Sequence, residues 1–68
     1  MNKYQFLTKC IDITASNNDL RDGQVVFNEM YKLNPDIANK YRGTEIDPFY
    51  DNNKMPLFID ACFNDIEG

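Results

Sequence analysis

The sequence predicts an all-α fold, a small compact bundle of about four short helices with an ordered loop before the last one, in a single domain over residues 1–68. Three observations favour this fold class. Apolar residues recur at steps of three and four, the spacing of one helix face. Asn34 and Pro35 together are typical of a helix start. Seven of the nine residues from 55 to 63 are apolar.

The first predicted helix runs from about Lys3 to Ala15. Residues at helical spacing form one apolar stripe, namely Tyr4, Leu7, Cys10, Ile11 and Thr14. Ile11 and Ile13 also alternate around Asp12 as a strand would, but the longer stripe favours a helix. The polar residues 16–18 then predict a turn.

The second predicted helix begins near Asp19, which we expect to cap it. Its apolar face comprises Val26, Phe27, Met30, Tyr31 and Leu33. Gly23 lies in the first turns, where glycine costs about 1 kcal/mol relative to alanine. Its use predicts that another backbone or side chain approaches closely. The neighbouring Gln24 has two equal interpretations, a partly buried hydrogen-bonding residue or a solvent-facing one.

The third helix is predicted to start at Asn34 and Pro35, with Ile37, Ala38 and Tyr41 on its apolar face. Lys40 and Arg42 fall in its last turn, where positive charge opposes the negative end of the helix dipole. Gly43 is the expected left-handed residue that ends it.

The last predicted helix follows Asp51, Asn52 and Asn53, any of which can cap it, and includes Pro56 in its first turn. A helix that is apolar on nearly all sides must be covered on nearly all sides. We expect it to be the central helix, wrapped by the other three. The alternative is a partly exposed helix that meets a partner, with Phe63 and Ile66 as the residues left over for that contact.

Charge divides the chain unevenly. The net charge is −4; residues 1–43 carry six basic and five acidic side chains, whereas residues 44–68 carry one basic and six acidic. Nucleic-acid phosphates would repel the second part, so direct nucleic-acid binding is not expected. The acidic residues either solvate the outer face or dock on something basic.

The chain has no apolar run of about 18 residues and its start lacks the pattern of a signal peptide, so no membrane span or export is expected and a cytoplasmic location follows. Cys10 and Cys62 lie among apolar residues, which favours reduced, buried thiols. A disulfide between them is the alternative.

Catalysis is not expected. The chain contains no histidine, which excludes Ser-His and Cys-His nucleophile pairs, and its three glycines form no phosphate-binding loop. Asp47 and Asp51 could act as acid and base only inside a walled cleft. Residues 47–54 lack the glycine and terminal Glu of a calcium loop. The sequence therefore predicts no cofactor and no metal ligand.

Residues 42–53, with the sequence RGTEIDPFYDNN, are the least helix-like part of the chain. Most of them are explained as a joint between two helices, with a turn at Asp47 and Pro48 that an Arg42–Asp47 ion pair could fix. Phe49 is expected to pack under the last helix, with Tyr50 half exposed. A binding site at these two rings is the alternative.

Two blocks in the middle of the chain have the patterns R-x-G-Q-x-x-F-N and R-G-T-x-x-D-P-F-Y. Their residues are Arg21, Gly23, Gln24, Phe27 and Asn28, then Arg42, Gly43, Thr44, Asp47, Pro48, Phe49 and Tyr50. About half of the chain, residues 21–52, thereby resembles a family of very short proteins encoded by tailed bacteriophages. The resemblance implies an accessory protein of an infected bacterial cell, a class that often binds and redirects or blocks a host protein.

Two functional hypotheses follow. The first is an interaction module that binds and modulates or inhibits a host bacterial protein, in one form as an anionic decoy for a nucleic-acid site. Its candidate partner-binding residues are Glu45, Asp47, Phe49, Tyr50, Asp51, Phe63 and Ile66. The second is a structural role, in which apolar surface on the last helix forms a homo-oligomer or joins a phage assembly.

Overall fold

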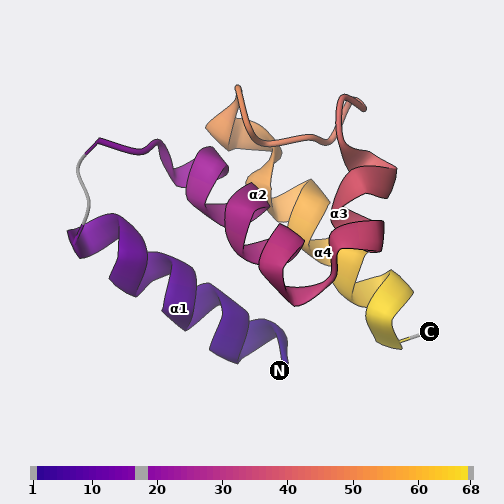
Figure 1. The fold of residues 1–68 in the computed structure, drawn as a ribbon, viewed down its shortest axis with the longest axis horizontal. Coiled ribbons are helices and arrows are strands. Elements are labelled where there is room, and N and C mark those ends of the chain that lie inside the picture. The colour runs from indigo at the N-terminus through magenta and orange to yellow at the C-terminus, as the bar shows by residue number, and fades with distance from the viewer. Residues whose placement is uncertain (1, 17–18, 68) are drawn as a thin grey trace.

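The computed structural model describes residues 2–16 and 19–67, and these residues form an all-α fold without strands. The prediction of a small bundle of four helices is confirmed (Figure 1). The elements are α1 Lys3–Ser16, α2 Asp22–Leu33, α3 Pro35–Tyr41, the 3-10 turn η1 Asn52–Lys54 and α4 Met55–Glu67.

The helix at the centre of the bundle is α2, which packs against α1, α3, η1 and α4 (Figure 1). Half of its twelve residues are buried. The prediction that the last helix would be central is therefore wrong. One side of α4 faces solvent, and Leu57 on it is 54% exposed. A short chain has too few helices to enclose two apolar helices, so only α2 is enclosed.

The buried face of α1 is rotated from the stripe that the sequence predicts. Phe6 and Cys10 are buried, whereas Tyr4 is 82% and Ile11 64% exposed. Because successive residues on a helix are 100° apart, the side that contacts α2 includes Phe6 and only the edge of the predicted stripe. Tyr4 and Ile11 of α1 are therefore left largely uncovered by their own chain.

The start of α2 lies two residues later than predicted, so Asp19 is not its cap. Arg21 occupies the cap position, and its backbone N–H donates to Gln24 Oε1 at 3.0 Å. This contact favours the first interpretation of Gln24, a half-buried hydrogen-bonding residue. Reaching back from the third helical position, its side chain satisfies a backbone group that the helix end leaves unpaired.

Both ends of α3 agree with the sequence prediction. Asn34 Oδ1 accepts the backbone N–H of Ile37 at 3.2 Å, and Pro35 is the first helical residue. Gly43 has a φ of +73°, the left-handed conformation that glycine adopts without strain. Further along, Asp51 Oδ1 accepts the N–H of Asn53 at 3.0 Å and begins η1, which continues directly into α4.

Glu29 of α2 is a carboxylate buried at the contact with α1. It is 5% exposed, and its two oxygens lie 3.0 Å from the ammonium groups of Lys9 and Lys32. Burial acts to raise the pKa of Glu29, but the hydrogen bonds and charges of the two lysines outweigh it and lower the pKa below 4.5. The ionised carboxylate thus ties α1 to α2.

The two cysteines are free and buried, as the sequence predicts. Burial raises the pKa of Cys10 to about 11, with a further contribution from the charge of Glu29. Burial likewise raises the pKa of Cys62 to about 12, with Asp65 adding to the shift. Both thiols are therefore protonated at neutral pH and unreactive while the protein is folded.

Candidate functional site

The loop that joins α3 to η1, residues 42–51, is fixed by the side chain of Asp47. Its Oδ2 accepts the backbone N–H of Gly43 at 2.6 Å and its Oδ1 accepts that of Phe49 at 2.9 Å. The predicted Arg42–Asp47 ion pair is not among the ion pairs of the described residues. The carboxylate instead satisfies two backbone donors, and the Arg42 guanidinium lies over the Phe27 ring, 5.6 Å from its centroid.

The first residues of α2 hold the same loop from the other side. The N–H of Gly23 donates to Asn52 Oδ1 at 2.9 Å, and Arg21 Nη2 donates to the carbonyl of Phe49 at 3.2 Å. A Cβ on Gly23 would lie 1.9 Å from the Pro48 carbonyl oxygen. The predicted close approach at Gly23 is therefore confirmed. Arg21 and Gly23 of the first sequence block here contact Phe49 and Pro48 of the second. This contact explains much of the pattern of the two blocks.

Four aromatic rings lead from the core to the tip of the loop. Ring centroids are 5.7 Å apart from Phe58 to Phe27, 5.9 Å from Phe27 to Phe49 and 4.9 Å from Phe49 to Tyr50. Phe49 thus packs against α2. The sequence had instead predicted that Phe49 packs under the last helix. The last ring, Tyr50, is 79% exposed, more than the half exposure expected.

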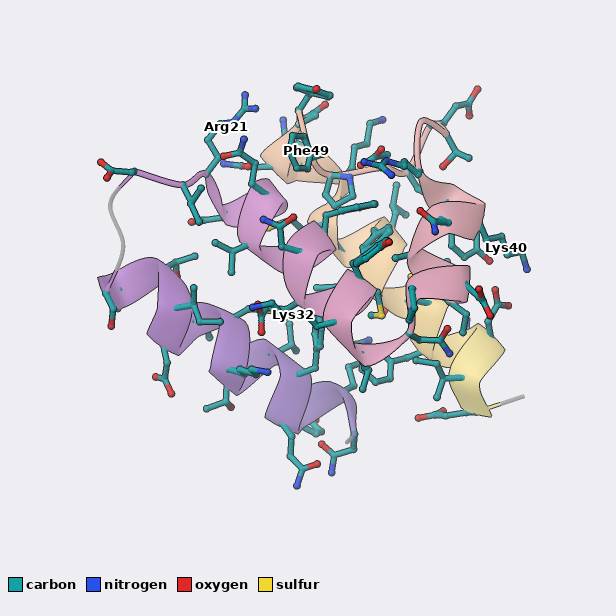
Figure 2. All side chains as sticks on the ribbon, in the orientation of Figure 1. Arg21, Lys32, Lys40 and Phe49 are labelled. Atoms are coloured by element: carbon teal, nitrogen blue, oxygen red, sulfur yellow. The ribbon has the colours of Figure 1, made fainter. Side chains whose placement is uncertain are left out.

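Arg21 completes the surface at the loop tip. Its guanidinium lies 5.7 Å from the centroid of the Tyr50 ring while its Nη2 binds Phe49 O, so it braces both aromatic residues. Figure 2 shows Arg21 and Phe49 side by side at the upper edge of the molecule. Sequence reasoning did not include Arg21 among the site residues. Its place at the head of the first sequence block was the one signal that could have indicated it.

The seven predicted site residues do not form one cluster. Asp47, Phe49, Tyr50 and Asp51 come together in the loop, and Glu45 is exposed in the same segment. Phe63 is wrong as a partner-binding residue, because it is 3% exposed and its ring packs edge-on against Phe6 at 5.4 Å. Ile66 is 39% exposed and lies in the last turn of α4. The loop precedes the first turn of this helix, so Ile66 lies at the other end of α4 from the loop.

The fold also changes the charge pattern that the sequence predicts. Asp60 pairs with Lys3 of α1. Asp65 accepts from Lys40 at 2.8 Å and from the Tyr41 hydroxyl at 2.7 Å (Lys40 is labelled in Figure 2), and these hydrogen bonds lower its pKa. Two of the six acidic side chains of residues 44–68 are thus paired with lysines, and Arg21 adds a positive charge at the loop, so the negative surface of this segment is interrupted.

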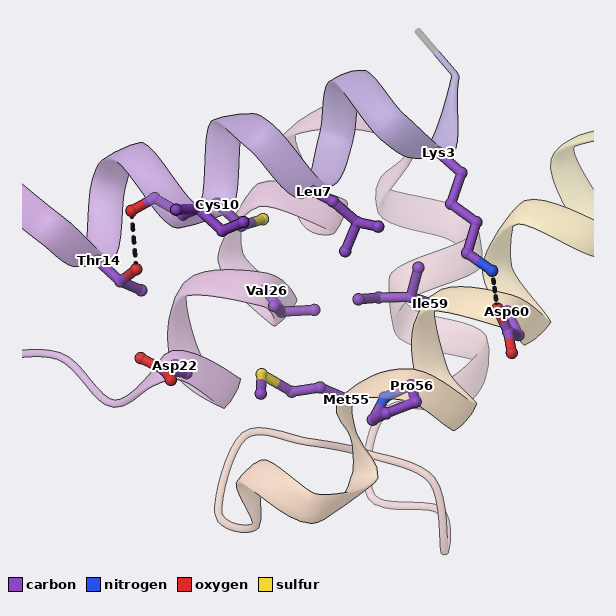
Figure 3. A pocket seen from close by; sticks show the side chains of 11 residues that line it. Lys3, Leu7, Cys10, Thr14, Asp22, Val26, Met55, Pro56, Ile59 and Asp60 are labelled. Carbon is purple, nitrogen blue, oxygen red and sulfur yellow. Dashed lines mark hydrogen bonds and ion pairs between the residues drawn. The ribbon is translucent and has the colours of Figure 1, made fainter.

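A second feature is an apolar groove between α1 and α4, with a volume of about 380 Å³. Figure 3 shows Leu7 and Cys10 of α1 on one side, Met55 and Ile59 on the other and Val26 of α2 at the floor. The Lys3–Asp60 ion pair closes one end of the groove. Thr14 of α1 and Asp22 of α2 lie at the opposite end (Figure 3).

Within residues 2–16 and 19–67, no three His, Cys, Asp or Glu side chains are grouped so that they could hold a metal ion. Among the helices of that same part of the chain, none has the length and apolar character needed to cross a membrane.

The fold and the loop surface define a small all-α domain with a braced, exposed aromatic residue. No protein-family model, curated protein or solved structure matches the chain.

Proposed function

We propose that this protein is an accessory interaction module of the bacteriophage type, which binds a host bacterial protein and modulates or inhibits it. The proposed contact is the Tyr50 surface, which we define as Arg21, Phe49, Tyr50 and Asp51. The observation that carries the proposal is the 79% exposure of a tyrosine ring that the fold holds in place. Tyrosine and arginine are enriched among the residues that dominate binding energy at interfaces.

The rigidity of the loop supports a binding role. Asp47 makes two hydrogen bonds to the backbone, and Gly23 and Arg21 add two more from α2. A partner that binds Tyr50 therefore has little loop entropy to remove, and preorganisation of this kind increases affinity. A loop that only joins two helices would not require an arginine guanidinium over an exposed tyrosine ring.

The charges at the loop favour an aromatic anchor over the anionic decoy. A decoy for nucleic acid needs a continuous negative surface. Here Asp60 and Asp65 are paired with lysines, and Arg21 lies over Tyr50. We therefore expect a partner surface with a hydrophobic recess for the ring and mixed charges around it, and binding that depends only moderately on salt.

Capture of proteins from bacterial lysate, followed by mass spectrometry, tests this proposal. Tyr50→Ala is expected to lose the specific partner, with affinity reduced at least about tenfold, because the ring supplies the anchor. Tyr50→Phe retains the ring and should retain most of the binding. The matched control is Tyr31→Ala, since Tyr31 is 45% exposed on α2 and outside the Tyr50 surface. If Tyr50→Ala captures the same proteins as wild type, the Tyr50 surface is not the contact.

A structural role in a phage assembly is the second candidate, and Leu57 and Ile66 favour it. They are 54% and 39% exposed on α4. Being nine residues apart, they lie on opposite sides of the helix and would touch two different neighbours. Such contacts extend into chains, so light scattering should show growth with concentration that Leu57→Asp stops. A species of fixed size would contradict this role.

A further inference from the structure

The uncovered side of α1 is continuous with the groove. Leu7 and Ile11 line the groove, and Ile11 remains 64% exposed. Tyr4, seven residues before Ile11, lies on the same side of the helix and is 82% exposed. An apolar helix face of about two turns beside an apolar groove is unusual for a surface that meets only water.

Five residues of α1 line the groove, and four of them have a symmetric spacing. Lys3, Leu7, Cys10 and Thr14 are separated by four, three and four residues, and Ile11 lies outside this pattern. A second α1 that runs antiparallel across the groove would therefore place Lys3 opposite Thr14 and Leu7 opposite Cys10. The line of contact would be about 16 Å long, from the helical rise of 1.5 Å per residue. Two identical helices packed antiparallel are related by a two-fold axis, so each of these contacts occurs twice in the interface.

The charges at the two ends of the groove complement each other in the same arrangement. Lys3 lies at one end beside Asp60, and Asp22 lies beside Thr14 at the other (Figure 3). No ion pair within the described part of the chain involves Asp22. An antiparallel second copy brings its Lys3 to this carboxylate, and the reciprocal contact forms at the other end.

We propose that a second copy of this chain covers the groove, so that the protein is a two-fold dimer in which the α1 helices pack antiparallel and each Ile11 enters the groove of the other copy. The dimer does not depend on the proposed binding of a host protein, but it excludes the second candidate, an assembly that grows with concentration. The groove is lined by none of the residues of the Tyr50 surface, so a dimer would carry two such surfaces and could bind a repeated partner more tightly.

Light scattering and sedimentation equilibrium over a range of concentrations test this proposal. We expect a dimer of fixed size for wild type. Ile11→Asp should weaken dimerisation at least about tenfold, since it buries a charge in the apolar groove. Because Ile11 is exposed in the single chain, circular dichroism should show unchanged helicity for this variant. Leu57→Asp is the matched control; Leu57 is also an exposed aliphatic residue but does not line the groove, and this variant should dimerise like wild type.

A charge exchange tests the antiparallel arrangement itself. Asp22→Lys places two ammonium groups together at each end of the interface and should weaken the dimer about tenfold. Adding Lys3→Glu together with Asp60→Lys restores opposite charges across the interface, keeps opposite charges at positions 3 and 60 within each chain, and should recover most of the affinity. A wild-type chain that stays monomeric at millimolar concentration, an Ile11→Asp chain that dimerises normally, or an exchange without recovery would each overturn the proposal.

Discussion

At the scale of a residue, Gly23 shows how one position joins two distant segments. Any other side chain would start with a Cβ 1.9 Å from the Pro48 carbonyl oxygen, which is backbone and cannot rotate away. We predict that Gly23→Ala destabilises the protein by about 1–3 kcal/mol, the usual cost of overpacking. The loss should be seen in chemical denaturation, despite the gain of about 1 kcal/mol in helix propensity.

Asn28→Ala is the control for this substitution, because Asn28 is exposed on the same helix. It should leave stability within about 0.5 kcal/mol of wild type. If Gly23→Ala instead stabilised the protein, helix propensity would dominate and the close contact between α2 and the loop would be wrong.

At the scale of an element, the attachment of α1 to α2 depends on the ionised Glu29. Its folded pKa lies below the ordinary value of 4.5, so the carboxylate contributes stability above pH 4.5 that is lost as the pH falls through the folded pKa. Glu29→Gln keeps the shape and removes the charge. We predict a loss of about 1–2 kcal/mol at neutral pH from the two ion pairs of this buried carboxylate, shrinking toward acid. Urea denaturation across pH measures it.

Asp12→Asn is the matched control, since Asp12 is an exposed carboxylate on α1. The stability difference between this variant and wild type should be small at neutral pH. A Glu29→Gln difference that stays constant from neutral to acid pH would mean that packing of the side chain, and not its charge, connects the two helices.

The elements also show what the sequence can and cannot predict. Asn34, Gly43 and Gly23 act within a few residues or through one steric requirement, so both ends of α3 and the close approach at Gly23 could be predicted, whereas the start of α2 was not. The rotation of α1 depends on which helix it packs against. The Phe6 contact could therefore not be predicted from the α1 sequence alone. The same limit applies to Arg21, whose partners Phe49 and Tyr50 lie 28 and 29 residues further along.

At the scale of the whole molecule, the two cysteines can report whether the bundle opens as one unit. Cys10 lies on α1 at the groove and Cys62 is wholly buried on α4, both protonated and inaccessible. A domain of this size usually unfolds in a single cooperative step. We predict that Cys10→Ala and Cys62→Ala, each with one remaining thiol, react with a thiol reagent at equal rates and with equal urea dependence.

The reason for expecting equal rates is that α1 is joined to both neighbours. Glu29 ties it to α2, while the Phe6–Phe63 ring contact and the Lys3–Asp60 ion pair tie it to α4. If Cys10 reacted faster than Cys62 and with a weaker dependence on urea, α1 would be opening while α2, α3 and α4 stayed folded. Ile11→Asp tests whether the dimer contributes to this protection. If a second copy covers the groove, the substitution should speed the labelling of both thiols equally at concentrations where wild type is dimeric, because the dimer stabilises the whole folded chain.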